Sequence, residues 1–156
     1  MKRIIDKLIE KKKTISTMES CTGGGVANAI TNIEGASEAL KFSAVTYSNE
    51  FKIKMGVSSD IIDKYSVYSI ETAMEMSKNI SNFTNSNYGV GITGKLNKVD
   101  INNLHGSDNT VFISIYDKDL DKFYNYDIEV NKKSRKENKE LVIDLVIEKL
   151  LEVMGD

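Results

Sequence analysis

The sequence contains no proline or tryptophan, one cysteine (Cys21) and one histidine (His105), and only two of its 21 basic residues, Arg3 and Arg135, are arginines. With one Cys and one His, the chain can form neither an internal disulfide nor a zinc site built from soft ligands. It also lacks a long apolar run, because charged residues interrupt the basic and apolar start from Asp6 onward. No signal peptide or membrane span is therefore predicted, and the free thiol favours a cytoplasmic protein.

The overall composition is that of an ordinary soluble globular chain. Its 156 residues are 40% hydrophobic and 28% charged, with a formal charge of −2. A chain of this length can bury roughly 68–70% of its unfolded surface, which suffices for a hydrophobic core without disulfides or a structural metal. We expect one domain over residues 1–156, with no metal and no cofactor. The slightly acidic balance argues against nucleic acid as a partner, and no membrane partner is expected.

Strand-like and helix-like segments alternate along the chain. The hydrophobic periodicity predicts strands at about 14–18, 41–47, 88–93, 110–117 and 122–130. Helices are expected at about 2–12 and 22–33, and a short helix is expected after the cap residue Asn49, followed by a further turn over 58–64. A longer helix is expected from Ser69 onward, and a last helix after a capping box formed by Ser134 and Glu137. This alternation predicts an α/β fold, a three-layer α/β/α sandwich with a mixed, mostly parallel sheet of about five strands.

The most informative stretch is TISTMESCTGGGVANAI at positions 14–30. A β-rich run is followed by Glu19, Ser20 and Thr22, and then by three glycines in a turn that leads into a helix. Free backbone N–H groups there favour either phosphate binding or nucleophilic attack beside an oxyanion hole. The spacing fits neither the P-loop, nor the dinucleotide turn, nor the G-x-S-x-G elbow. The alternative is that Ser20 or Thr22 merely caps the helix and the glycines serve packing.

A serine nucleophile needs a base, and His105 lies in a polar loop where a solvated side chain is expected. Lys52 is the other candidate, because the strand ending at Tyr47 leads to a helix capped by Asn49, which places Lys52 in its first turn. A helix N-terminus and partial burial both disfavour a charged lysine, so its pKa should fall. The alternative is an ordinary surface lysine. If Ser20 is the nucleophile, its hydroxyl should lie within hydrogen-bond reach of Lys52 or Tyr47.

Four segments, in order over nearly the whole chain, resemble the CinA C-terminal domain family: 17–37, 44–57, 69–77 and 91–94. This family includes stand-alone amidohydrolases that convert nicotinamide mononucleotide to nicotinate mononucleotide and ammonia in pyridine nucleotide salvage. The resemblance implies a single CinA C-terminal-like domain with the three-layer fold, no cofactor, a small-molecule nucleotide as substrate, and a homo-oligomer such as a dimer.

The resemblance also assigns roles to individual residues. It makes Ser20 the nucleophile, Lys52 the acceptor of its proton, and Tyr47 a residue that relays or orients that proton. The thiol of Cys21 is a rival nucleophile on position alone, since thiols at helix N-termini have depressed pKa values, but the family favours Ser20, with Cys21 packed against the sheet. Turn amides at 22–24 could stabilise the oxyanion. The substrate-binding positions implied are Thr22, Gly23, Gly24, Asn49, Thr93, Gly94 and Arg135.

Two of the departures from the family fall in motifs expected at the substrate site. The family continues its third strand as T-G-x-A-G-P with further glycines, whereas only Thr93 and Gly94 remain here and KLNKVDINNLHG follows. The family also has G-D-R before its last helix, where NKKSRKE offers only Arg135, either for bidentate phosphate binding or as an exposed first-turn residue. Two alternatives therefore stand beside the deamidase: a non-catalytic nucleotide-binding or regulatory protein, and an amidase for another small amide.

Overall fold

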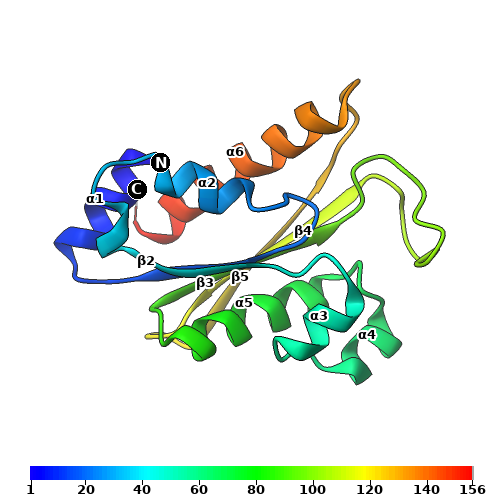
Figure 1. Cartoon of the computed structure of the whole chain (residues 1–156), viewed down its shortest axis with the longest axis horizontal. Coiled ribbons are helices and arrows are strands. Elements are labelled where there is room, and N and C mark those ends of the chain that lie inside the picture. Colours follow the sequence, from blue (N-terminus) through cyan, green and yellow to red (C-terminus); the bar gives the residue numbers. More distant parts are fainter. Residues whose placement is uncertain (156) are drawn as a thin grey trace.

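The computed structural model describes residues 1–155, and its centre is a five-stranded mixed sheet in the order β2-β1-β3-β4-β5 (Figure 1). β1, β2 and β3 run parallel, while β4 is antiparallel to β3 and β5 is antiparallel to β4. The predicted mixed sheet is confirmed. The strands are β1 (Ile15–Glu19), β2 (Leu40–Val45), β3 (Tyr88–Gly94), β4 (Thr110–Asp117) and β5 (Lys122–Glu129).

Helices cover both faces of the sheet, as the three-layer expectation required (Figure 1). One layer holds α1 (Lys2–Glu10), α2 (Gly25–Thr31) and α6 (Arg135–Val153); the other holds α3 (Asn49–Lys54), α4 (Ser59–Tyr65) and α5 (Ile70–Thr84). A short 3-10 helix, Ala36–Glu38, precedes β2. No helix within residues 1–155 is both long enough and apolar enough to cross a membrane.

The central strand β3 is buried along its whole length, and α5 packs directly on it. A Cβ placed on Gly89 would lie 2.0 Å from the carbonyl oxygen of Ser77, and one on Gly91 would lie 2.3 Å from that of Ala73. Any side chain at these two glycines would therefore push the helix off the strand. This close contact fixes β3 relative to the helix layer that carries α3.

Several helix starts follow the expected capping chemistry, and others differ. The hydroxyls of Ser69 and Ser134 accept hydrogen bonds from backbone N–H groups three residues on, which confirms both caps. The predicted cap Asn49 is wrong, because Ser48 caps α3 and Asn49 is its first residue. The second helix begins at Gly25 instead of position 22, because the left-handed φ values of Gly23 and Gly24 (60° and 88°) form a turn first. The segment expected as a turn at 58–64 is helical, forming α4.

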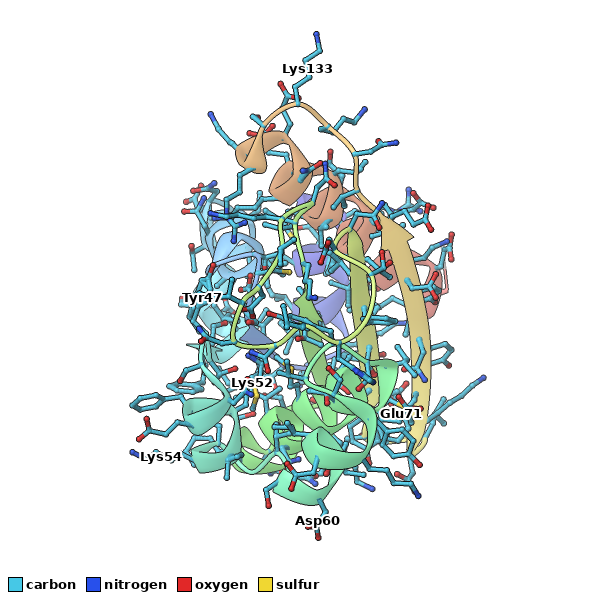
Figure 2. The ribbon with its side chains drawn as sticks, turned by 90° about the vertical axis from the view of Figure 1, so that its right-hand side faces the viewer. Tyr47, Lys52, Lys54, Asp60, Glu71 and Lys133 are labelled. Atoms are coloured by element: carbon cyan, nitrogen blue, oxygen red, sulfur yellow. The ribbon has the colours of Figure 1, made fainter. Side chains whose placement is uncertain are left out.

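The carboxyl ends of β1, β2 and β3 lie at one edge of the sheet because these strands are parallel and adjacent. The turn at 19–25, the segment 46–52 and the loop 95–109 all leave the sheet there. Ligands of open α/β sheets bind at such an edge. Figure 2 looks toward this end: loop 95–109 crosses in front of the sheet, with Lys52 below it and Tyr47 to one side.

Candidate active site

The turn after β1 is organised by Glu19, whose carboxylate is fully buried. It accepts hydrogen bonds from the hydroxyl of Thr22 (2.7 Å) and from the backbone N–H groups of Val26 (2.9 Å) and Ala27 (3.0 Å). These N–H groups belong to the first turn of α2, where an anion is favoured and the donors otherwise lack partners. Sequence reasoning missed this role. The sequence feature that could have revealed this role is an acidic residue directly before the turn that leads into a helix.

Ser20 is held by the backbone of this turn so that its hydroxyl faces α3. Its N–H donates to the carbonyl of Ile92 on β3 (3.1 Å), and its own carbonyl accepts from the N–H of Gly23 (2.9 Å). Its Oγ accepts a hydrogen bond from Nζ of Lys52 at 3.0 Å. The predicted contact between Ser20 and Lys52 is confirmed, across 32 residues of sequence.

Lys52 is a buried lysine, with only 2% of its surface exposed. Its Nζ also donates to the carbonyl oxygen of Thr46 at 2.7 Å. It forms no ion pair with a carboxylate among the described residues, and burial lowers its pKa to about 8. At that pKa about a tenth of the side chains are neutral at pH 7, far more than for an exposed lysine. Burial is the main cause of the low pKa, whereas the prediction from sequence gave equal weight to burial and to the helix N-terminus.

Cys21 lies next to Ser20 on the wall of the same cavity, and only 5% of it is exposed. Burial raises the pKa of its thiol to about 12. The thiol is therefore protonated at neutral pH and a poor nucleophile. The desolvation of this position outweighs any benefit from the helix N-terminus, and Cys21 packs in the core beside the sheet, as expected.

Tyr47 and Arg135 lie far apart in the sequence and contact each other at the cavity wall. Nη2 of Arg135 donates to the hydroxyl oxygen of Tyr47 at 2.9 Å, and both residues line the cavity. Tyr47 is 60% exposed, and within residues 1–155 its hydroxyl bonds to neither Ser20 nor Lys52. The structure thus places Tyr47 with the arginine that the resemblance assigned to phosphate.

The cavity has a volume of about 530 Å³ and is closed on one side by loop 95–109. Asp100 in this loop accepts hydrogen bonds from the hydroxyl of Tyr68, the N–H of Asn102 (3.0 Å) and Nδ2 of Asn103 (3.2 Å). Asn49 donates to Oδ1 of Asn103 at 3.1 Å, which ties the loop to α3. These loop residues and Tyr68 were missed, because their place in the site depends on how the loop folds back.

The remaining predicted binding positions lie in three places. Gly94 lines the cavity, whereas Thr93 is fully buried and its hydroxyl donates to the carbonyl of Val67 at 2.9 Å. The turn residues 22–24 line a second hollow, which shares Arg135 with the cavity. His105 is exposed, as expected.

The backbone N–H groups of the turn differ in whether they are already paired. The N–H of Gly23 bonds to the carbonyl of Ser20 and that of Cys21 to its own sulfur, whereas the N–H groups of Thr22 and Gly24 have no acceptor in the described part of the chain. No group of three or more His, Cys, Asp or Glu residues within 1–155 is placed to hold a metal ion.

Comparison with known proteins gives a consistent result over the chain. A "CinA-like protein" of Flavobacterium psychrophilum is 42% identical over 116 residues, covering 72% of this chain and 27% of that protein. A "competence-damage inducible protein" of Clostridium beijerinckii is 50% identical over 88 residues, covering 56% of this chain and 22% of that protein. The matches thus span about a quarter of the length of these curated relatives.

The fold has close counterparts among solved structures. A CinA superfamily protein of Klebsiella pneumoniae superposes with a TM-score of 0.90 at 19% identity, covering 99% of this chain and 94% of that chain. The family model for the CinA C-terminal domain matches residues 1–154. This chain therefore belongs to the CinA C-terminal domain family.

Proposed function

We propose that this chain is an amidohydrolase that cleaves the carboxamide of nicotinamide mononucleotide, giving nicotinate mononucleotide and ammonia in pyridine nucleotide salvage. The observation that carries the proposal is the 3.0 Å hydrogen bond between Oγ of Ser20 and Nζ of a buried Lys52 whose pKa is about 8. A nucleophile beside a base whose pKa lies near working pH is the arrangement that acyl transfer requires.

The chemistry follows from these two groups. Neutral Lys52 takes the proton of Ser20 as Oγ attacks the carboxamide carbon, and in this proposal the free N–H groups of Thr22 and Gly24 bond the developing oxyanion. The Lys52 ammonium then protonates the leaving nitrogen, which departs as ammonia and leaves an ester on Ser20. Water, deprotonated by Lys52, hydrolyses the ester and releases the carboxylate. The carbonyl of Thr46 accepts a hydrogen bond from Nζ throughout.

The cavity suits a mononucleotide in size and in polarity. Its volume of about 530 Å³ lies within the range typical of small-molecule sites. Arg135 carries a fixed positive charge at the wall, oriented by Tyr47, where it would bind the phosphate. In this proposal Tyr47 acts by orienting Arg135, and Asn49 and Gly94 contribute to the walls that enclose the substrate.

Release of ammonia from nicotinamide mononucleotide by the pure protein tests the proposal. We expect turnover by the wild type, with the Ser20→Ala protein as the control for a contaminating amidase. Absence of ammonia at high protein concentration, while a known amidase releases it in the same buffer, would refute the enzymatic function.

A second candidate is a nucleotide-binding or regulatory protein without turnover. It is favoured by loop 95–109, because a polar segment stands where the family has its glycine-rich loop. Thermal stabilisation by nicotinamide mononucleotide, with no hydrolysis after long incubation, would support it. If the mononucleotide gives neither stabilisation nor ammonia, release of ammonia from other small amides would identify the chain as an amidase of different substrate range.

A further inference from the structure

Asp100 is a half-buried carboxylate on the cavity wall formed by loop 95–109. Three donors hold it in place: the hydroxyl of Tyr68, the backbone N–H of Asn102 and Nδ2 of Asn103. These hydrogen bonds, that of Tyr68 above all, hold the pKa of Asp100 below its ordinary value. The side chain is therefore ionised at neutral pH, and its position in the cavity is fixed by the protein.

The negative charge of Asp100 has no partner of opposite sign in direct contact within residues 1–155. Lys95, the nearest buried cation on the loop, pairs with Asp108 at 3.4 Å and lies over the ring of Tyr68. Arg135 donates to Tyr47. Lys98 also lines the cavity, but its side chain is exposed to solvent.

The charge matters most in the reactive form of the site. Lys52 must be neutral to accept the proton of Ser20, and the Asp100 carboxylate then remains in the cavity without a counter-charge from the base. Its field favours the charged form of Lys52 and so opposes the state that catalysis needs. Its three hydrogen bonds and the field of Lys95 stabilise the carboxylate, but no cation of the described residues touches it. A cationic group of a ligand would therefore gain an ion pair at this wall of the cavity.

We propose that Asp100 is a specificity-determining residue that pairs with positive charge on the ring of the substrate, so that the site selects pyridinium amides over neutral aromatic amides. This inference rests on the proposed amidohydrolase function. A carboxamide placed at Ser20 brings the ring that carries it into the cavity bordered by Asp100. The bound cation also offsets the field of Asp100 at Lys52, so that binding the correct charge favours the neutral base. Recognition and base activation are thereby coupled.

The test compares two ligands of nearly equal shape, nicotinamide mononucleotide and the benzamide C-nucleotide, whose ring is neutral. Binding is measured by calorimetry in a Ser20→Ala background, so that no hydrolysis occurs, with and without Asp100→Asn. Asparagine keeps the size of the side chain and its oxygen acceptor but removes the charge. Asp144→Asn, which removes one negative charge from an exposed residue of α6 that does not line the cavity, is the matched control.

We expect Asp100→Asn to weaken binding of the pyridinium nucleotide about tenfold, equivalent to about 1.4 kcal/mol, and to leave the neutral nucleotide almost unchanged. Asp144→Asn should affect neither. An equal loss for both ligands, or no binding of either ligand to the Ser20→Ala protein, would overturn the inference. A melting curve for each variant, together with Asp100→Glu, which keeps the charge, separates a misfolded loop from a lost ion pair.

The outcome is independent of turnover. If the wild type releases no ammonia but the charge-dependent binding is seen, the proposed hydrolysis fails and the role of Asp100 stands. If ammonia is released while Asp100→Asn affects both nucleotides equally, the hydrolysis stands and the role of Asp100 fails.

Discussion

The turn at 19–25 and the loop 95–109 leave adjacent parallel strands at the same edge of the sheet and form opposite parts of one site. The turn is short and buried, and the carboxylate of Glu19 binds its hydroxyl and helix N–H groups. The loop is long and polar, and its tip is solvated: Ile101 and Leu104 are 82% and 71% exposed. The loop is tied to the rest of the protein at its buried start, Lys95 and Leu96, and near Asp100, through Tyr68 and Asn49.

The difference indicates that the turn and the loop have different roles in the proposed site. The hydroxyl of Ser20, the proposed nucleophile, is held by a turn whose backbone bonds to β3, and precise positioning of this kind favours catalysis. The wall proposed to contact the rest of the substrate is a loop, and loops tolerate sequence change because few buried contacts depend on them. The chain retains the family pattern in the turn and departs from it in the loop. The following substitutions test this contrast, from the largest expected effect to the smallest.

Replacing Ser20 with alanine should lower kcat for amide hydrolysis about 10³-fold or more, because the acyl-enzyme can no longer form. Its neighbour Cys21 provides the comparison. Cys21→Ala should retain activity of the same order as the wild type, since the buried thiol is protonated and takes no part. Steady-state ammonia release measures both. Loss of activity in Cys21→Ala with normal folding would make the thiol the nucleophile instead.

Lys52→Met should abolish hydrolysis and change how stability depends on pH. The pKa of Lys52 is about 8 in the folded protein against 10.5 ordinarily, so between these values the unfolded chain binds one more proton than the folded one. Stability of the wild type relative to the variant should therefore rise with pH across this window, by up to about 3 kcal/mol. Urea unfolding of both proteins from pH 7 to 11 measures it.

The same pKa predicts the acid limb of the activity profile. Activity should fall about tenfold per pH unit below pH 8, because Lys52 must be neutral to act as the base. A profile that is flat between pH 6 and 9, with chemistry rate-limiting, would contradict Lys52 as the base. A flat difference in stability between wild type and Lys52→Met would contradict its lowered pKa.

Glu19→Gln should destabilise the protein by about 1–3 kcal/mol, because an amide nitrogen would face a backbone N–H of Val26 or Ala27 that now bonds to a carboxylate oxygen. Glu34→Gln is the matched control on an exposed glutamate and should change stability very little. The free energy of unfolding in urea compares them. Equal values for the two variants would show that the buried carboxylate does not hold the turn.

Ile101→Ser should have the smallest effect, below about 0.5 kcal/mol on stability, with kcat unchanged, because the side chain is 82% exposed at the tip of the loop. His105→Ala, also on an exposed residue of this loop, should behave in the same way. Thermal melts and the ammonia assay measure both. A large loss of activity in either variant would mean that the tip contacts the substrate, and the contrast with the turn would weaken.

Sequence reasoning succeeded where the decisive pattern is local. The strand, the glycine turn and the following helix are contiguous, so their order could be read directly, and the β-branched and apolar runs indicated the strands. The contact between Ser20 and Lys52 was also predicted, because a serine nucleophile needs a base and the family resemblance pairs these two residues. In the fold Ser20 directly follows β1, and Lys52 lies in α3, which follows the neighbouring parallel strand β2. Errors arose at boundaries: Ser48 and Asn49 are both good capping residues, and only the backbone distinguishes the cap from the first helical position.

The sequence by itself determined the α/β alternation, the family, and the chemical types available at the turn, since these depend on periodicity and short motifs. Only the tertiary structure decided that Lys52 is buried enough for a pKa of about 8, that the Cys21 thiol is buried with a raised pKa, that Tyr47 pairs with Arg135, and that Asp100 lines the cavity. The physical reason is that burial and charge pairing depend on segments distant in sequence. A low pKa or an unpaired carboxylate therefore exists only once the strands, helices and loop have packed together.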